Sequence, residues 1–305
     1  MAQHPAADRR ILFVHAHPDD ESIGNGLTMA KYVAEGAHVT LVTCNLGERG
    51  EVLVPELAHL AFEADGGLAE HRLGELRDAM ALLGVTDHRR LGGDFAYHDS
   101  GMKWGADGNA EAMDDIDPRA FWAADLLEAA NHLVAIIREV RPQVLVTYDE
   151  FGGYGHPDHV QAHRVAHYAA ALAAAPSHRR DLGEAWDVAK IYWSAMSARF
   201  VRDHLALLEQ AGGNLEDFGI IGDQLPPFFR EDEDLDARIE APEHVEAKLA
   251  AMRAHATQIT PDGAFFAMGM DVAALQWGAE YYRLVKGDRG PVGESGLEDD
   301  LFAGL

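Results

Sequence analysis

The chain has 305 residues, of which 48% are hydrophobic, so it is long enough for a large domain with an extensive core and a smaller attached portion. Its 25 basic residues stand against 51 acidic ones, and the formal charge of −26 argues against nucleic acid or an anionic membrane as a partner. The single cysteine, Cys44, excludes an internal disulfide framework and a cysteine-rich zinc module, and we expect it to be a buried, inert thiol.

No segment approaches the roughly 20 consecutive apolar residues of a membrane span. The first apolar run, 11–14, is too short for a secretory leader and is followed at once by polar residues. We therefore expect a cytoplasmic protein without a membrane partner. Nothing in the sequence specifies an oligomeric state.

The first 175 residues alternate between short β-rich runs and longer helical patterns. The apolar spacing predicts strands at 11–14, 38–44 and 144–147, and helices at 27–34, 70–83, 120–140 and 157–174. Alternation of this kind is typical of βαβ units. The sequence therefore predicts an α/β fold with a Rossmann-like, mostly parallel sheet flanked by helices.

The character of the chain changes after residue 185, where we expect a smaller, mixed C-terminal portion to begin. A strand is predicted at 188–193, and the next 45 residues look irregular. The acidic stretch 224–236, which contains two prolines, is predicted to be a surface loop. Alternating apolar residues at 235–241 predict a further strand, and Pro242 is suited to open a helix that reaches about Thr257.

Two of the predicted strands end in polar loops with a shared pattern. The first loop, 15–21, reads His-Ala-His-Pro-Asp-Asp-Glu, and the second, 148–159, ends in Gly-Tyr-Gly-His-Pro-Asp-His. Each contains His-Pro-Asp followed by a potential metal ligand, Asp20 in one loop and His159 in the other. Ligands of open α/β sheets bind beyond the carboxyl ends of the strands, so we expect the two loops to form one site.

Imidazole and carboxylate groups without a thiolate suit zinc or another divalent first-row metal such as iron(II). His17, Asp20 and His159 would leave coordination positions open for water and substrate. Asp19, next to Asp20, is the natural base for activating water. Asp and His at strand ends can also serve only as helix caps. The repetition of the pattern at two equivalent strand ends favours the metal site.

Two further histidines lie close to these motifs. His163 follows His159 by four residues, the spacing of a helical zinc motif, but Val160 stands where that motif has glutamate. We expect His163 to pack or to hydrogen-bond rather than to bind metal. His15 is expected to have a similar supporting or core role.

The two loops resemble the signatures of the zinc-dependent N-acetylglucosaminyl deacetylase family of the LmbE/PIG-L type. The resemblance runs through nearly the whole chain and includes the segments 46–48, 50–52, 72–76, 99–102, 255–258 and 301–304. It implies hydrolysis of the acetamide of a small-molecule glycoside, N-acetylglucosaminyl-inositol, in mycothiol biosynthesis. Residues 1–185 would form the metal-binding catalytic domain, and residues 186–305 would complete the substrate pocket.

The resemblance also implies roles for matching positions. Asp19 would take a proton from the attacking water and return it to the leaving amine. His156, oriented by Asp158, would stabilise the oxyanion or act as an acid, and Tyr154 would stabilise the oxyanion. The zinc ligands would be His17, Asp20 and His159, and iron(II) would fit the same set.

Three charged residues are implied to bind the substrate. Glu51, Arg72 and Asp99 would hold hydroxyl groups of the sugar and the inositol. Charged side chains of this kind are also common as members of surface ion pairs, and only the resemblance singles these three out.

Three alternatives to this deacetylase function make different demands on the sequence or the fold. The amidase of mycothiol S-conjugates, from the same family, has lysine where Gly24 stands and proline where Gly155 stands, so the sequence favours the deacetylase. An iron(II) oxygenase would use a similar ligand set on a barrel of antiparallel strands. A sugar-binding or metal-sensing protein with a silent site would be expected to lack Asp19 or a ligand.

Overall fold

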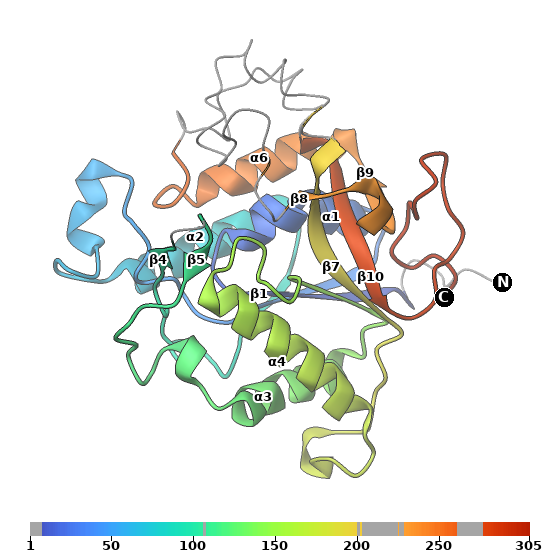
Figure 1. The fold of residues 1–305 in the computed structure, drawn as a ribbon, viewed down its shortest axis with the longest axis horizontal. Coiled ribbons are helices and arrows are strands. Elements are labelled where there is room, and N and C mark those ends of the chain that lie inside the picture. The colour runs from blue at the N-terminus through green and yellow to red at the C-terminus, as the bar shows by residue number, and fades with distance from the viewer. Residues whose placement is uncertain (1–7, 106–107, 200–201, 203–224, 226–228, 261–276) are drawn as a thin grey trace.

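A single large sheet forms the centre of the molecule (Figure 1). The computed structural model describes residues 8–105, 108–199, 202, 225, 229–260 and 277–305. The strand order is β3-β2-β1-β6-β7-β10-β9, with β8 paired to β7. The strands are β1 (Arg10–His15), β2 (His38–Thr43), β3 (Asp87–Arg90), β6 (Val144–Thr147), β7 (Lys190–Ser197), β8 (Phe229–Arg230), β9 (Ala237–Glu240) and β10 (Ala279–Lys286). A separate hairpin consists of β4 (Lys103–Trp104) and β5 (Ala110–Glu111).

The sheet is mostly parallel, as predicted. Pairing is parallel from β3 through β2, β1 and β6 to β7, whereas β10 runs antiparallel to its neighbours β7 and β9. Apolar residues of β1 and β6 have no exposed surface, because strands of a parallel sheet are covered on both faces. This is not the antiparallel barrel that an iron(II) oxygenase would have required.

Helices cover the two faces of the sheet (Figure 1). On one face lie α1 (Asp20–Ala34), α2 (Leu68–Leu83) and α6 (Val245–Ala254), and on the other lie α3 (Leu126–Val140) and α4 (Pro157–Ala174). Short 3-10 turns occupy 55–60, 121–123, 180–182, 232–234 and 242–244. Among the described residues, none of the helices combines the length and the hydropathy needed to cross a membrane.

Most predicted elements are confirmed, with changes at their ends. β6 and α4 have the predicted bounds, whereas α1 begins already at Asp20, in a polar first turn that an apolar pattern does not indicate. α3 begins only at Leu126, because the Asp125 side chain caps it by accepting the N–H of Glu128 at 2.8 Å. The helix expected from Pro242 starts at Val245 and ends before Thr257.

The prediction for the later part of the chain is only partly accurate. The surface loop expected at 224–236 contains the short strand β8, and β3 and β10 were not predicted. Most of the stretch expected to be irregular lies outside the described residues. The division of the chain at residue 185 stays a prediction, and the strands after it continue the same sheet.

The strand order determines where a ligand can bind. β1 lies between β2 and β6, and the chain winds away from β1 in opposite directions on its two sides. A crevice forms beyond the carboxyl ends of strands at such a point. The loops that follow β1 and β6 therefore meet there.

Candidate active site

The loops after β1 and β6 bring four predicted site residues together. His17 and Asp20 come from the first loop and the start of α1, and His156 and His159 come from the start of α4. The three histidines each offer a ring nitrogen within 4.8 Å of the other two. Asp20 lies between two of them, with Oδ2 3.4 Å from His17 Nδ1 and Oδ1 3.3 Å from His159 Nε2.

The hydrogen bonds of His159 determine which ring nitrogen is free. Nδ1 lies 3.2 Å from the carbonyl oxygen of Gly152, which can only accept, so Nδ1 carries the proton. Nε2 then carries a lone pair, is buried, and has no hydrogen-bond partner among the described residues. A buried lone pair that faces a carboxylate is costly unless a cation lies between the two groups.

His17 is arranged in a similar way. Its Nε2 donates to the carboxylate of Asp158 at 3.2 Å, which leaves Nδ1 directed toward Asp20, where it can hold either a proton or a metal ion. A carboxylate behind a histidine is the usual support of a metal-binding imidazole. The donor set of His17, Asp20 and His159 therefore fits a divalent metal ion.

The electrostatics of the cluster agree with a site for a cation. Burial disfavours charge on His17, yet Asp158 and Asp20 hold its pKa well above the ordinary range. Burial likewise raises the pKa of Asp20, but the neighbouring His159 and His17 bring it well below its ordinary value. The carboxylates around His17 thus favour a positive charge at the site.

Gly152 explains how the second loop approaches His159 so closely. Its φ is +67°, and a Cβ at this position would lie 2.8 Å from the Cβ of His159 and 2.7 Å from the backbone nitrogen of Val160. Only glycine fits such an approach with this backbone conformation. Gly152 is therefore needed to place His159.

His156 is oriented by Asp158, but through the main chain. The backbone N–H of Asp158 donates to His156 Nδ1 at 3.1 Å, so the ring proton is on Nε2. The Asp158 carboxylate is bound instead to His17, Asn45 and Ser100. Burial, together with His17 and His159, holds the pKa of His156 well below its usual value, which makes it a neutral hydrogen-bond donor.

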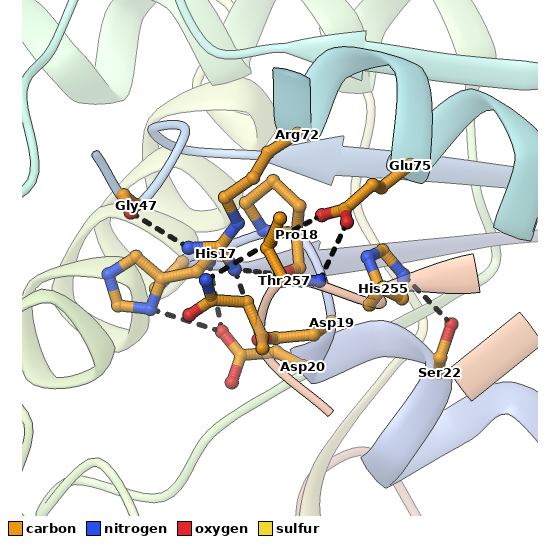
Figure 2. Close-up of polar contacts among 12 residues, drawn as sticks. His17, Pro18, Asp19, Asp20, Ser22, Gly47, Arg72, Glu75, His255 and Thr257 are labelled. Carbon is orange, nitrogen blue, oxygen red and sulfur yellow. Dashed lines mark hydrogen bonds and ion pairs between the residues drawn. The ribbon is translucent and has the colours of Figure 1, made fainter. Parts of the chain in front are cut away.

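Asp19 occupies a strained position at the start of α1. Its φ is 119°, a region that residues with side chains rarely adopt and that costs on the order of 1–3 kcal/mol. Its Oδ2 accepts a hydrogen bond from Arg72 at 3.0 Å. Burial raises the pKa of Asp19 to about 6, against the opposing effect of Arg72. Figure 2 shows Asp19 with Arg72 and His17 on one side and His255 on the other.

The residues predicted to bind substrate differ in their surroundings. Arg72 is buried, and its guanidinium also donates to the carbonyl of Gly47 at 2.9 Å. Asp99 is buried with Oδ1 3.8 Å from His17 Nε2. Glu51 is exposed on the loop after β2. The ring centre of Tyr154 lies 5.1 Å from that of His159. Together these contacts place Arg72, Asp99 and Tyr154 at the site.

Tyr148 is a part of the site for which the sequence predicted no role. Its hydroxyl donates to Asp20 Oδ2 at 2.7 Å and accepts the N–H of Ala16 at 2.9 Å. Its ring stacks on His159 with the centres 4.3 Å apart. A role for Tyr148 could have been predicted from its position directly after the strand 144–147, because this places it at the same edge of the sheet as His17 and Asp20.

The supporting roles predicted for two histidines are confirmed. His15 bonds Asn25 at 2.8 Å and the hydroxyl of Tyr148 at 3.2 Å. His163 bonds the carbonyl of Tyr148 at 3.0 Å. Cys44 is buried and free, also as predicted.

Comparisons with known proteins agree with this geometry. The family model described as PIG-L, GlcNAc-PI de-N-acetylase, matches residues 12–170. The chain therefore belongs to the PIG-L family, and the matched region contains the loops that follow β1 and β6.

Two relatives are similar over almost their whole length. One, from a Nocardioides species, is 66% identical over 98% of this chain and 99% of its own, and another, from Kribbella flavida, is 60% identical over 98% of each chain. Both are named 1D-myo-inositol 2-acetamido-2-deoxy-alpha-D-glucopyranoside deacetylase. The N,N'-diacetylchitobiose deacetylase from Pyrococcus horikoshii shares the fold, with a TM-score of 0.59, 19% identity, and coverage of 93% of this chain and 87% of its own.

We predict that Tyr148→Phe weakens metal binding. The variant removes the hydroxyl that orients Asp20, and loss of such a supporting hydrogen bond costs about 10–100-fold in metal affinity. Competition with a chelator for Zn²⁺ measures the change on metal-free protein. Tyr168→Phe, at a partly exposed position of α4, is the matched control. An affinity equal to that of the wild type would contradict the role given to Tyr148.

Proposed function

We propose that the protein hydrolyses the acetamide of N-acetylglucosaminyl-inositol, giving glucosaminyl-inositol and acetate in mycothiol biosynthesis. The observation that carries the proposal is the buried Nε2 of His159, which faces Asp20 and has no hydrogen-bond partner among the described residues. The full-length identity of 66% to the Nocardioides deacetylase supports the choice of substrate.

The ligands are His17, Asp20 and His159, and zinc is the metal that we propose, with iron(II) as the alternative. When bound, the metal supplies Lewis-acid chemistry to the acetamide carbonyl and makes water a better nucleophile at neutral pH. The remaining steps belong to the side chains around it.

Asp19 acts as the general base and then as the general acid. It accepts a proton from the attacking water and delivers it to the nitrogen of the leaving amine. Arg72 holds the carboxylate in place through the contact at 3.0 Å. Because amide nitrogen is a poor leaving group, return of this proton is needed for the C–N bond to break.

His156 and Tyr154 stabilise the negative oxygen that develops on the acetamide carbonyl. His156 is suited to this role because its Nδ1 is occupied by the N–H of Asp158, which leaves the Nε2 proton for donation. Donors that are already oriented toward developing charge make large contributions to catalysis.

Glu51, Arg72 and Asp99 hold the hydroxyl groups of the sugar and the inositol. Asp99 lies next to His17, at the edge of the proposed metal site. Arg72 keeps one buried N–H, at Nε, without a hydrogen-bond partner among the described residues.

The main alternative is the amidase of mycothiol S-conjugates, and one loop residue argues against it. Gly155 has a φ of +98°, and a Cβ there would lie 2.6 Å from the carbonyl oxygen of Ala110. Proline, which stands at this position in the amidase pattern, is restricted to φ near −65°. This loop therefore has a conformation that the amidase sequence would not adopt.

The substrate is tested by measuring amine release from N-acetylglucosaminyl-inositol and from a mycothiol S-conjugate, at equal concentration, with metal-loaded protein. We expect a higher kcat/KM for the first substrate. Preference for the conjugate would favour the amidase, and no amine from either substrate would contradict the proposal.

Asp19→Asn should abolish turnover while the protein keeps its metal. The amide cannot accept the proton, so we expect kcat to fall by about 10²–10⁴-fold. Metal analysis of the same sample should still give the wild-type metal content, because Asp19 is not among the ligands. Nearly unchanged turnover would show that another group is the base.

His156→Ala should lower kcat by about 10²–10³-fold through loss of the donor to the oxyanion. Steady-state kinetics measure the effect, and His132→Ala, at a partly exposed position on α3, serves as the control. A loss smaller than about tenfold would contradict the role of His156.

A further inference from the structure

We propose that Glu21 and His255 are positioning residues that hold the base, Asp19, in its strained conformation. This inference rests on the proposed role of Asp19. It assigns a function to two buried side chains whose carboxylate and imidazole groups do not contact the proposed metal ligands. It also gives the C-terminal portion of the chain a part in catalysis.

The backbone of Asp19 is held by three hydrogen bonds. Its N–H donates to Glu21 Oε2 at 3.0 Å, and its carbonyl accepts the N–H groups of Ser22 and Ile23, each at 3.0 Å. The bonds to the carbonyl are those of any helix start. The bond to Glu21 is different, because it fixes the peptide on the other side of the φ angle of 119°. At its other end the same peptide is held by Arg72, which donates to the carbonyl oxygen of Pro18, so loss of the Glu21 bond leaves the peptide fixed at one end only.

Glu21 is itself fixed from outside its helix. Its Oε1 accepts Ser22 Oγ at 2.6 Å and lies 2.8 Å from His255 Nε2. The side chains of Glu21 and His255 both have an exposure of 0%. A buried carboxylate on the first turn of a helix could be satisfied by backbone groups alone. Here it is paired with an imidazole from a segment that follows α6.

The position of His255 is fixed in turn by α2. The next residues form a turn in which the N–H and the hydroxyl of Thr257 both bond the buried carboxylate of Glu75, each at 2.8 Å. Figure 2 shows the contacts between Glu75 and Thr257 near His255, and Arg72, from the same helix as Glu75, in contact with Asp19. The base is thus held at its side chain by Arg72 and at its backbone by Glu21, and α2 supports each contact.

The test is a pair of substitutions of Glu21. Glu21→Ala removes the acceptor for the N–H of Asp19. If the alanine variant does not fold, Glu21→Asp is used in its place, because aspartate keeps the charge but is too short to reach the same N–H. We expect kcat to fall by about 100-fold with KM changed by less than about threefold, because a displacement of about 1 Å has such effects on rate. Metal content stays at the wild-type value. Glu21→Gln retains an acceptor oxygen and should recover most of kcat.

Glu280→Ala, with Glu280→Gln beside it, is the matched control for the two corresponding variants of Glu21. Glu280 is also a buried carboxylate that accepts two N–H groups of α1, from Leu27 and Thr28, and pairs with a buried cation, Lys248, at 2.6 Å. It acts on the same helix but not on Asp19, so its variants should keep the wild-type kcat whatever their stability. An equal loss of kcat in Glu21→Ala and Glu280→Ala would overturn the positioning role, since the effect would then be one of general stability.

Two measurements separate this inference from the proposed function. In the Asp19→Asn background, Glu21→Ala should lower the residual kcat by less than about threefold, because residues that act through one another are not additive. Hydrogen exchange of the Asp19 amide, which needs no activity, should become faster in Glu21→Ala and stay slow in Glu280→Ala. The inference would be overturned if the losses of kcat in the two single variants multiplied in the double variant. An unchanged exchange rate or a loss of metal in Glu21→Ala would also overturn it. If Asp19→Asn alone were fully active, the proposed role of Asp19 as the base would fail, whereas the proposed function itself fails only if the unchanged protein releases no amine.

Discussion

The structure around the site depends on one electrostatic constraint: a carboxylate and two imidazole nitrogens are buried against one another at the ends of two adjacent strands. Asp20 lies within 3.4 Å of His17 and within 3.3 Å of His159. Each imidazole has its other nitrogen committed to a protein acceptor, so neither can relieve the contact by turning. A divalent cation satisfies all three groups at once, and the glycines and prolines of the two loops are arranged to bring them together.

The same constraint explains the polar groups that surround the ligands. Asp158 and Tyr148 fix His17 and Asp20, and each is in turn held by groups from other loops. Asp19 must stay next to the ligands without becoming one, and its strained backbone turns its carboxylate toward Arg72. The proposed base and the proposed ligand are thus adjacent in sequence but held by different partners.

The sequence predicted the parts of the site that are local. Asp19 and Asp20 were found because a short loop carries them directly after an apolar strand. The pairing of Glu21 with His255 could not be found in this way, because 234 residues separate them and nothing local marks the contact. Likewise β3 was missed because its side chains are polar and only half-buried at the sheet edge. β10 was missed because its buried face includes Glu280, whose charge is balanced by Lys248 from α6.

The central claim, that the two loops form one metal centre, is tested most directly by titrating metal-free protein with Zn²⁺ and recording X-ray absorption at the zinc edge. The account predicts one tightly bound ion per chain, with the signature of two imidazole ligands in the wild type and of one in His159→Ala. A wild-type spectrum without imidazole ligands, or one that is the same in His159→Ala, would contradict it.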